Sequence, residues 1–207
     1  MPWTIDLSGQ QIFYRLFAAV VVVTVHGLAA VILARLLGDR GPQYDGRLSL
    51  SPFRHLDPVG MLSAVLTQFG WSRPPRLTTA DVRGGVFGIV IVILGALAVL
   101  LVLAKGLWML RGVVFAALPA ASVGVVGVGL LERTAEMAVH FAVFNLVPLP
   151  PLAAGLLIGA LAPDLCRWIE KRMMFFAIGI GLLTLSGMAG MILARPTRQF
   201  AAFIFNL

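Results

Sequence analysis

The side chains that could do chemistry are few and lie in apolar surroundings. His26 stands in the middle of an unbroken apolar run, and His140 follows Glu136 by four residues. An ionisable side chain in a membrane helix is costly to bury, so it marks a functional site by default. Residues four apart share one helix face. The stripe Glu132, Glu136 and His140, together with His26, is therefore a candidate metal or proton site.

A structural role is the alternative for each of these residues. Glu132 can lie at the membrane interface, with Glu136 one turn deeper and His140 hydrogen-bonded to a neighbouring helix. His26 can pair with a backbone carbonyl, with Thr24 or with a water molecule. The spacing alone does not separate these interpretations.

The composition predicts the class of protein in which these residues must be positioned. Of 207 residues, 59% are hydrophobic and only 12% are charged, whereas a soluble domain has about 25% charged residues. We therefore expect an all-α polytopic membrane protein, with residues 1–207 forming a single integral membrane domain. The net charge of +7 comes from basic clusters between apolar runs, which suits lipid headgroups rather than nucleic acid.

The apolar runs predict about five to six transmembrane or re-entrant helices. The segment at 58–71 is short for a span and has basic loops on both sides, which favours a re-entrant helix. Asp45-Gly46 signals a turn, and the alternation after it predicts a short β-like stretch at 47–50. We expect Arg195-Pro196-Thr197-Arg198 to end the last span. The predicted spans are 12–37, 58–71, 84–110, 113–131, 134–147, 152–163 and 173–194.

A proline-rich stretch interrupts the helical pattern near the end of the fifth predicted span. Pro148, Pro150 and Pro151 cannot continue a regular helix. Irregular backbone within a membrane is tolerated only where protein buries it or where it lines a cavity. Asn145 and the three prolines are therefore candidates for contacts with a partner segment or with the chain's own backbone.

Three stretches resemble the site-2 protease family of intramembrane zinc metalloproteases, in particular its compact bacterial members without a PDZ domain. The first is His26-Gly27-Leu28-Ala29-Ala30 followed by Gly38-Asp39. The second runs from Gly46 to Gly60 and includes Arg47-Leu48-Ser49-Leu50-Ser51-Pro52 and His55-Leu56-Asp57-Pro58. The third is Phe144-Asn145-Leu146-Val147-Pro148-Leu149-Pro150-Pro151-Leu152-Ala153-Ala154-Gly155. The resemblance covers nearly the whole chain.

The resemblance also implies a site from which this sequence departs. The family takes two zinc ligands from a His-Glu-x-x-His helix and a third from an Asp in the proline-rich stretch, and the Glu is the general base. Here His26 is kept, while Gly27 replaces the Glu, Ala30 the second His and Ala153 the Asp. We therefore expect a degenerate member, or pseudoprotease, with no metal site and no catalytic residues. His55 and Asp57 are expected to fix a turn and to have no chemical role.

These departures favour a function by binding. We expect a non-catalytic accessory subunit or assembly factor of a larger membrane complex, including an energy-transducing one. It would bind transmembrane helices of partner proteins and lipids in a bacterial inner membrane. One alternative is a zinc metalloprotease whose ligands have moved to His26, Glu136 and His140. A second alternative is a proton or ion conduit along the Glu132, Glu136 and His140 stripe.

Overall fold

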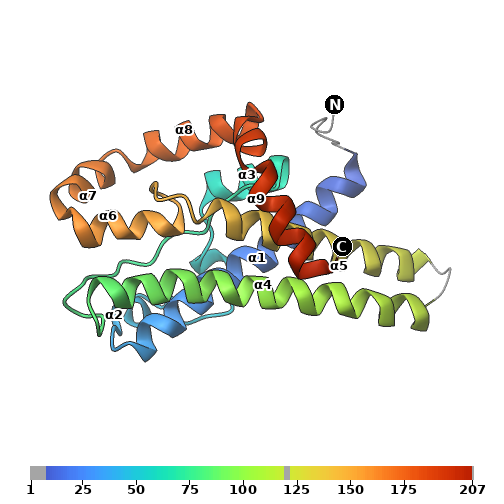
Figure 1. Cartoon of the computed structure of the whole chain (residues 1–207), viewed down its shortest axis with the longest axis horizontal. Helices are drawn as coiled ribbons and strands as arrows, with labels where there is room; N and C mark the ends of the chain where they lie inside the picture. The colour runs from blue at the N-terminus through green and yellow to red at the C-terminus, as the bar shows by residue number, and fades with distance from the viewer. Residues whose placement is uncertain (1–7, 119–121, 207) are drawn as a thin grey trace.

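The structure, a computed structural model, describes residues 8–118 and 122–206. Within these ranges the chain is helical and contains no β-sheet (Figure 1). The elements are α1 (Gly9–Leu36), α2 (Gly41–Tyr44), η1 (Pro52–Arg54), α3 (Pro58–Thr67), α4 (Val86–Ala117), α5 (Ser122–Phe144), η2 (Ala153–Gly155), α6 (Leu156–Leu161), α7 (Pro163–Glu170), α8 (Met173–Leu185) and α9 (Met188–Phe205).

Helices α1, α4 and α5 form the centre of the molecule. The N–H of Arg83, just before α4, donates to the carbonyl of Leu37 at the end of α1 (2.7 Å), so these two helices run in opposite directions. Figure 1 shows α4 and α5 side by side, with α9 lying across them. The largest core cluster joins α1, α4 and α5 through buried side chains that include Val22, Leu100 and Phe141.

Two of the helices have the length and composition of membrane helices. Among the described residues, α1 and α4 are long and apolar enough to cross a membrane. The pair α8 and α9, which is bent by 73°, would make a third span if it is counted as one. Apolar side chains also cover much of the outer surface, including Phe13, Phe87 and Phe175. The chain is thus an all-α integral membrane protein.

Two predicted breaks in the middle of the chain are wrong. We expected one span to end near residue 110 and the next to end near residue 131, but α4 continues to Ala117 and α5 runs unbroken from Ser122 to Phe144. Charged residues do not break a helix when they have partners. Arg111 pairs with Glu132 across the two helices (2.7 Å), and Arg133 pairs with Glu136 within α5 (2.7 Å).

The C-terminal prediction is also wrong. A single span over 173–194 was expected, with a stop at the following proline. Instead α8 ends at Leu185, Gly187 adopts a positive φ of 79°, and α9 continues through Pro196 to Phe205. Contacts of α9 with α5 and α4, including the stacking of Phe205 on Trp108 (4.2 Å between ring centroids), stabilise a helix that carries a proline.

The predicted β-like stretch at 47–50 does not form a strand. Residues 48–50 lie in bends and Arg47 has no regular structure, and the described part of the chain contains one isolated antiparallel bridge, between Leu56 and Ser72. The short apolar segment forms α3, which packs between α1 and α8. Asp57 caps α3, because its carboxylate accepts the N–H of Gly60 (2.8 Å).

This cap gives a first prediction. Replacing Asp57 by Ala removes the acceptor at the N-terminus of α3 and should lower the free energy of unfolding by about 1 kcal/mol. Asp57→Asn retains a side-chain oxygen and should cost less. The measurement is the Tm of the detergent-solubilised protein, followed by tryptophan fluorescence. Equal losses in the two variants would show that the cap does not stabilise α3.

Candidate functional site

The imidazole of His26 lies in the interior of the helical bundle. The residue is only 3% exposed, its Nδ1 is 2.8 Å from the hydroxyl of Ser72, and its ring lies 5.1 Å from that of Phe141. The other ring nitrogen, Nε2, is buried without a hydrogen-bond partner among the described residues. His26 thus bridges α1 to the extended chain that follows α3 and packs against α5.

His55 fills the space beside Gly27. A Cβ added at Gly27 would come within 2.3 Å of His55 Nδ1, so no side chain fits at this position while His55 stays in place. His55 is fully buried, its Nε2 lies 2.8 Å from the carbonyl oxygen of Ser49, and its Nδ1 has no partner in the described chain. Sequence reasoning assigned His55 to a turn and missed this contact. The signal available was a histidine within one of the three family-like stretches.

Ala30 and Ala153 are buried in apolar contacts. Ala30 packs in a cluster with Val92 and Ala96 of α4. Ala153 packs in a different cluster, with Ile93 and Leu97 of the same helix. The two alanines at which the resemblance implies zinc ligands therefore join the apolar packing around α4.

An extended stretch of backbone, residues 70–74, passes through the centre of this site. The carbonyl of Gly70 accepts from Asn145 Nδ2 (2.8 Å), and the N–H of Arg73 donates to the carbonyl of His55 (2.7 Å). The path is tight, since a Cβ at Gly60 would lie 2.4 Å from the carbonyl oxygen of Trp71. We call residues 70–74 the crossing segment.

Arg47 holds the far end of the crossing segment. Its guanidinium donates to the carbonyls of Arg73 and Pro74, the latter at 2.7 Å, and the residue is 7% exposed. Burial and the nearby Arg73 lower the pKa of Arg47 to about 10, so it remains charged at neutral pH. Sequence reasoning did not single out Arg47, although it lies in the second family-like stretch.

Asn145 joins the crossing segment to the proline-rich loop. Its Nδ2 also donates to the carbonyl of Phe141 (2.9 Å), and its Oδ1 accepts the N–H of Ala153 (3.0 Å). Pro150 and Pro151 are buried, whereas Pro148 is exposed. The amide of Asn145 is thus fully used by the chain's own backbone.

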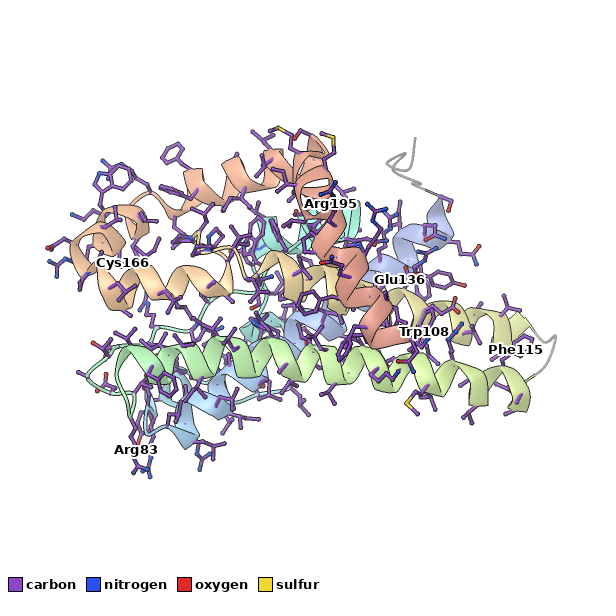
Figure 2. The ribbon with its side chains drawn as sticks, in the orientation of Figure 1. Arg83, Trp108, Phe115, Glu136, Cys166 and Arg195 are labelled. Carbon is purple, nitrogen blue, oxygen red and sulfur yellow. The ribbon has the colours of Figure 1, made fainter. Side chains whose placement is uncertain are left out.

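The polar stripe of α5, formed by Glu132, Glu136 and His140, shares no hydrogen bond or ion pair with His26. Glu132 pairs with Arg111 and Glu136 with Arg133. His140 Nδ1 lies 2.8 Å from the carbonyl oxygen of Glu136, and its ring meets Phe69 edge-on. Figure 2 shows Glu136 on α5 near the crossing of α9. Within residues 8–118 and 122–206, no three His, Cys, Asp or Glu side chains are grouped as metal ligands.

A sequence comparison with a known protein shows the family of this chain. The chain is 30% identical over 162 residues to "Putative zinc metalloprotease YwhC" of Bacillus subtilis (strain 168), a match that covers 72% of this chain and 69% of that protein. The chain belongs to this zinc metalloprotease family. The predicted relationship to site-2 proteases is confirmed at this level. No family model and no solved structure matches the chain.

The donor atoms around His26 do not fit the zinc ion that this metalloprotease family implies. A catalytic zinc ion needs about three protein ligands and an open position for water. Two imidazole nitrogens, His26 Nε2 and His55 Nδ1, lie buried and unpaired in this region. Ala30 and Ala153 contribute no donor atom, and Gly27 offers no base.

The contact between Gly27 and His55 gives a second prediction. Gly27→Ala overpacks the site and should lower the free energy of unfolding by about 1–3 kcal/mol. The loss should be smaller in a His55→Ala background, where the imidazole no longer blocks the methyl group, and a double-mutant cycle measures this coupling.

The matched control is Gly106→Ala in α4, where a Cβ meets no atom within 4 Å. This change should be neutral or stabilising by up to about 1 kcal/mol, because alanine favours helix. Additive losses for Gly27→Ala and His55→Ala would contradict the proposed contact.

Proposed function

We propose that this chain is a non-catalytic member of its zinc metalloprotease family that acts by binding other membrane proteins. The observation that carries the proposal is the packing at the family's catalytic positions. His55 takes the space beside Gly27, and Ala30 and Ala153 are buried among apolar side chains of α4. His26, at the position where the resemblance implies the first zinc ligand, is hydrogen-bonded to the hydroxyl of Ser72.

The C-terminal end of α4 and the N-terminal end of α5 project together, which supports the binding role. Nineteen residues, 86–104, precede Lys105 in α4, and they span about 29 Å at 1.5 Å per residue, close to the hydrocarbon thickness of about 30 Å. Lys105, Arg111 and Glu132 then lie at the level of the lipid headgroups. With this placement, residues 112–117 of α4 and 122–131 of α5, which we call the helical arm, extend beyond that level. Figure 2 shows these ends of α4 and α5 extending past α9.

The helical arm is apolar where a protein in water would be polar. Val113, Phe115, Val123 and Val125 are each more than half exposed. Contiguous exposed apolar surface of this kind marks an interaction site. We propose that an apolar helix of a partner membrane protein covers the arm, which would make this chain an accessory subunit or assembly factor.

Placing α4 across the membrane in this way also suggests how the other helices and the basic loops are arranged. We propose that α3 is re-entrant, that α5 and the bent pair α8 and α9 also enter the membrane, and that the chain thereby has five to six transmembrane or re-entrant helices. We further propose a bacterial inner membrane as its location. The basic loops that contain Arg40, Arg47 and Arg54 would then face the cytoplasm, following the positive-inside tendency.

No specific observation favours either alternative, the relocated zinc protease or the proton or ion conduit. The relocated zinc site needs Glu136, which pairs with Arg133. The conduit needs Glu132 and Glu136 free to exchange protons, and both are in ion pairs.

The absence of catalysis is a third prediction. The protein, purified in mild detergent, should hold less than one zinc ion per ten chains by elemental analysis and should not cleave a panel of single-span membrane substrates. His26→Ala is the matched variant. Stoichiometric zinc, together with cleavage that His26→Ala abolishes, would establish the relocated protease instead.

The helical arm gives a fourth prediction. A photo-crosslinking amino acid at Phe115, which is 62% exposed in the arm, should capture one dominant membrane protein in native membranes. Phe87, which is 70% exposed near the other end of α4, is the matched control and should give lipid adducts. Phe115→Ser should shift the complex to smaller size in native gels, whereas Phe87→Ser should not. The same adducts and the same migration at both positions would reject the arm as the binding surface.

A further inference from the structure

A groove opens between α9 and the packed ends of α3 and α5. It has a volume of about 420 Å³, within the range of small-ligand pockets. Its lining is mostly apolar, from Phe69, His140, Gly190, Met191, Ala194, Thr197 and Arg198. Gly190 and Ala194 lie four residues apart on α9, so two small side chains on one helix face leave room along the groove.

Two polar side chains, those of Thr197 and Arg198, line the C-terminal end of the groove. The hydroxyl oxygen of Thr197 is buried and has no hydrogen-bond partner in the described chain, and the residue is 6% exposed. Arg198 donates through Nε to the carbonyl of Ala194 (3.2 Å) and lines a second hollow, of about 320 Å³, together with Arg195. A buried polar group that has no partner is costly, so a ligand that supplies acceptors would be bound favourably.

The charges of α9 contrast with those of the neighbouring helices. Arg111 and Arg133 each have a glutamate partner at 2.7 Å. Neither Arg195 nor Arg198 has an acidic partner within the described ranges. Figure 2 shows Arg195 on α9. The middle of α9 therefore carries two positive charges without acidic partners beside an apolar groove.

We propose that this groove binds one anionic phospholipid. Its acyl chain would lie along Gly190, Met191 and Ala194, and its phosphate would accept hydrogen bonds from Arg198, Arg195 and the Thr197 hydroxyl. Charge-assisted bonds from guanidinium to phosphate are strong, and a free phosphate ion would leave the apolar length of the groove empty. A partner helix would cover the apolar part without supplying acceptors. The site goes beyond the proposed function and does not depend on it.

The test is native mass spectrometry of the delipidated full chain, titrated with phosphatidylglycerol, with phosphatidylcholine of the same acyl chains, and with inorganic phosphate. We expect one tightly bound phosphatidylglycerol, bound at least tenfold more tightly than phosphatidylcholine. Each arginine should contribute about fivefold to the affinity, so Arg195→Gln/Arg198→Gln should weaken phosphatidylglycerol binding about 25-fold. Binding of phosphatidylcholine should change little.

Three further variants separate the groove from general electrostatics. Lys171→Gln/Arg172→Gln removes the same charge from the junction of α7 and α8 and should change phosphatidylglycerol binding less than twofold. Gly190→Leu fills the groove and should weaken binding of both lipids. Thr197→Val should lower phosphatidylglycerol affinity while leaving the Tm of the lipid-free protein unchanged or higher, because it removes a buried hydroxyl without a partner.

Each outcome decides the proposal. Equal affinity for the two lipids, or equal loss in the control pair at Lys171 and Arg172, would overturn it. Competition by inorganic phosphate as strong as that by phosphatidylglycerol would assign the arginines to a free-anion site instead. If the arginine double variant fails to fold, the Thr197→Val result and the Gly190→Leu result remain, and unchanged phosphatidylglycerol affinity in both would reject the groove.

Discussion

The structure depends on satisfying the irregular backbone of the crossing segment, whose first three residues are buried in the protein. Buried N–H and C=O groups need partners, so each must find one within the protein. Asn145, Arg47 and the backbone of His55 provide these partners, and Ser72 adds a side-chain bond to His26. These contacts come from α1, from the loop before α3 and from the end of α5. One stretch of extended chain therefore fixes the relative positions of the central elements.

This role gives a structural reason for two residues of the family-like stretches, Asn145 and Arg47. Asn145 binds three backbone groups, and Arg47 binds two carbonyls, so either loss would leave buried polar groups unpaired. Gly27, Ala30 and Ala153 have no polar side chain that could make such bonds, and the N–H of Ala153 is itself bound by Asn145. In this structure Asn145 and Arg47 are the centre of a hydrogen-bonded frame, and His55 packs against α1 beside it.

The charged residues of α4, α5 and α9 organise the opposite end of the molecule. Arg111 stacks on Trp108 at 3.6 Å while it pairs with Glu132, and Trp108 in turn stacks on Phe205. Three helices are thus joined at one level by ion pairing and ring stacking. Beyond this level lies the apolar helical arm, and beside it lie the unpaired arginines of α9. The paired charges connect helices within the chain, whereas the uncovered groups are available to molecules outside it.

The sequence by itself determined that the chain is an all-α membrane protein, that α1 surrounds His26, that helix is interrupted at Pro148–Pro151, and that the chain resembles a zinc metalloprotease. These follow from composition, from apolar run length and from local motifs. Only the tertiary structure decided that Arg111 and Pro196 lie inside helices, because the Arg111–Glu132 ion pair and the packing of α9 on α4 and α5 offset the local cost. It also decided that His55 fills the space beside Gly27 and that Arg47 holds the crossing segment. Such contacts join residues far apart in the chain, and no local pattern encodes them.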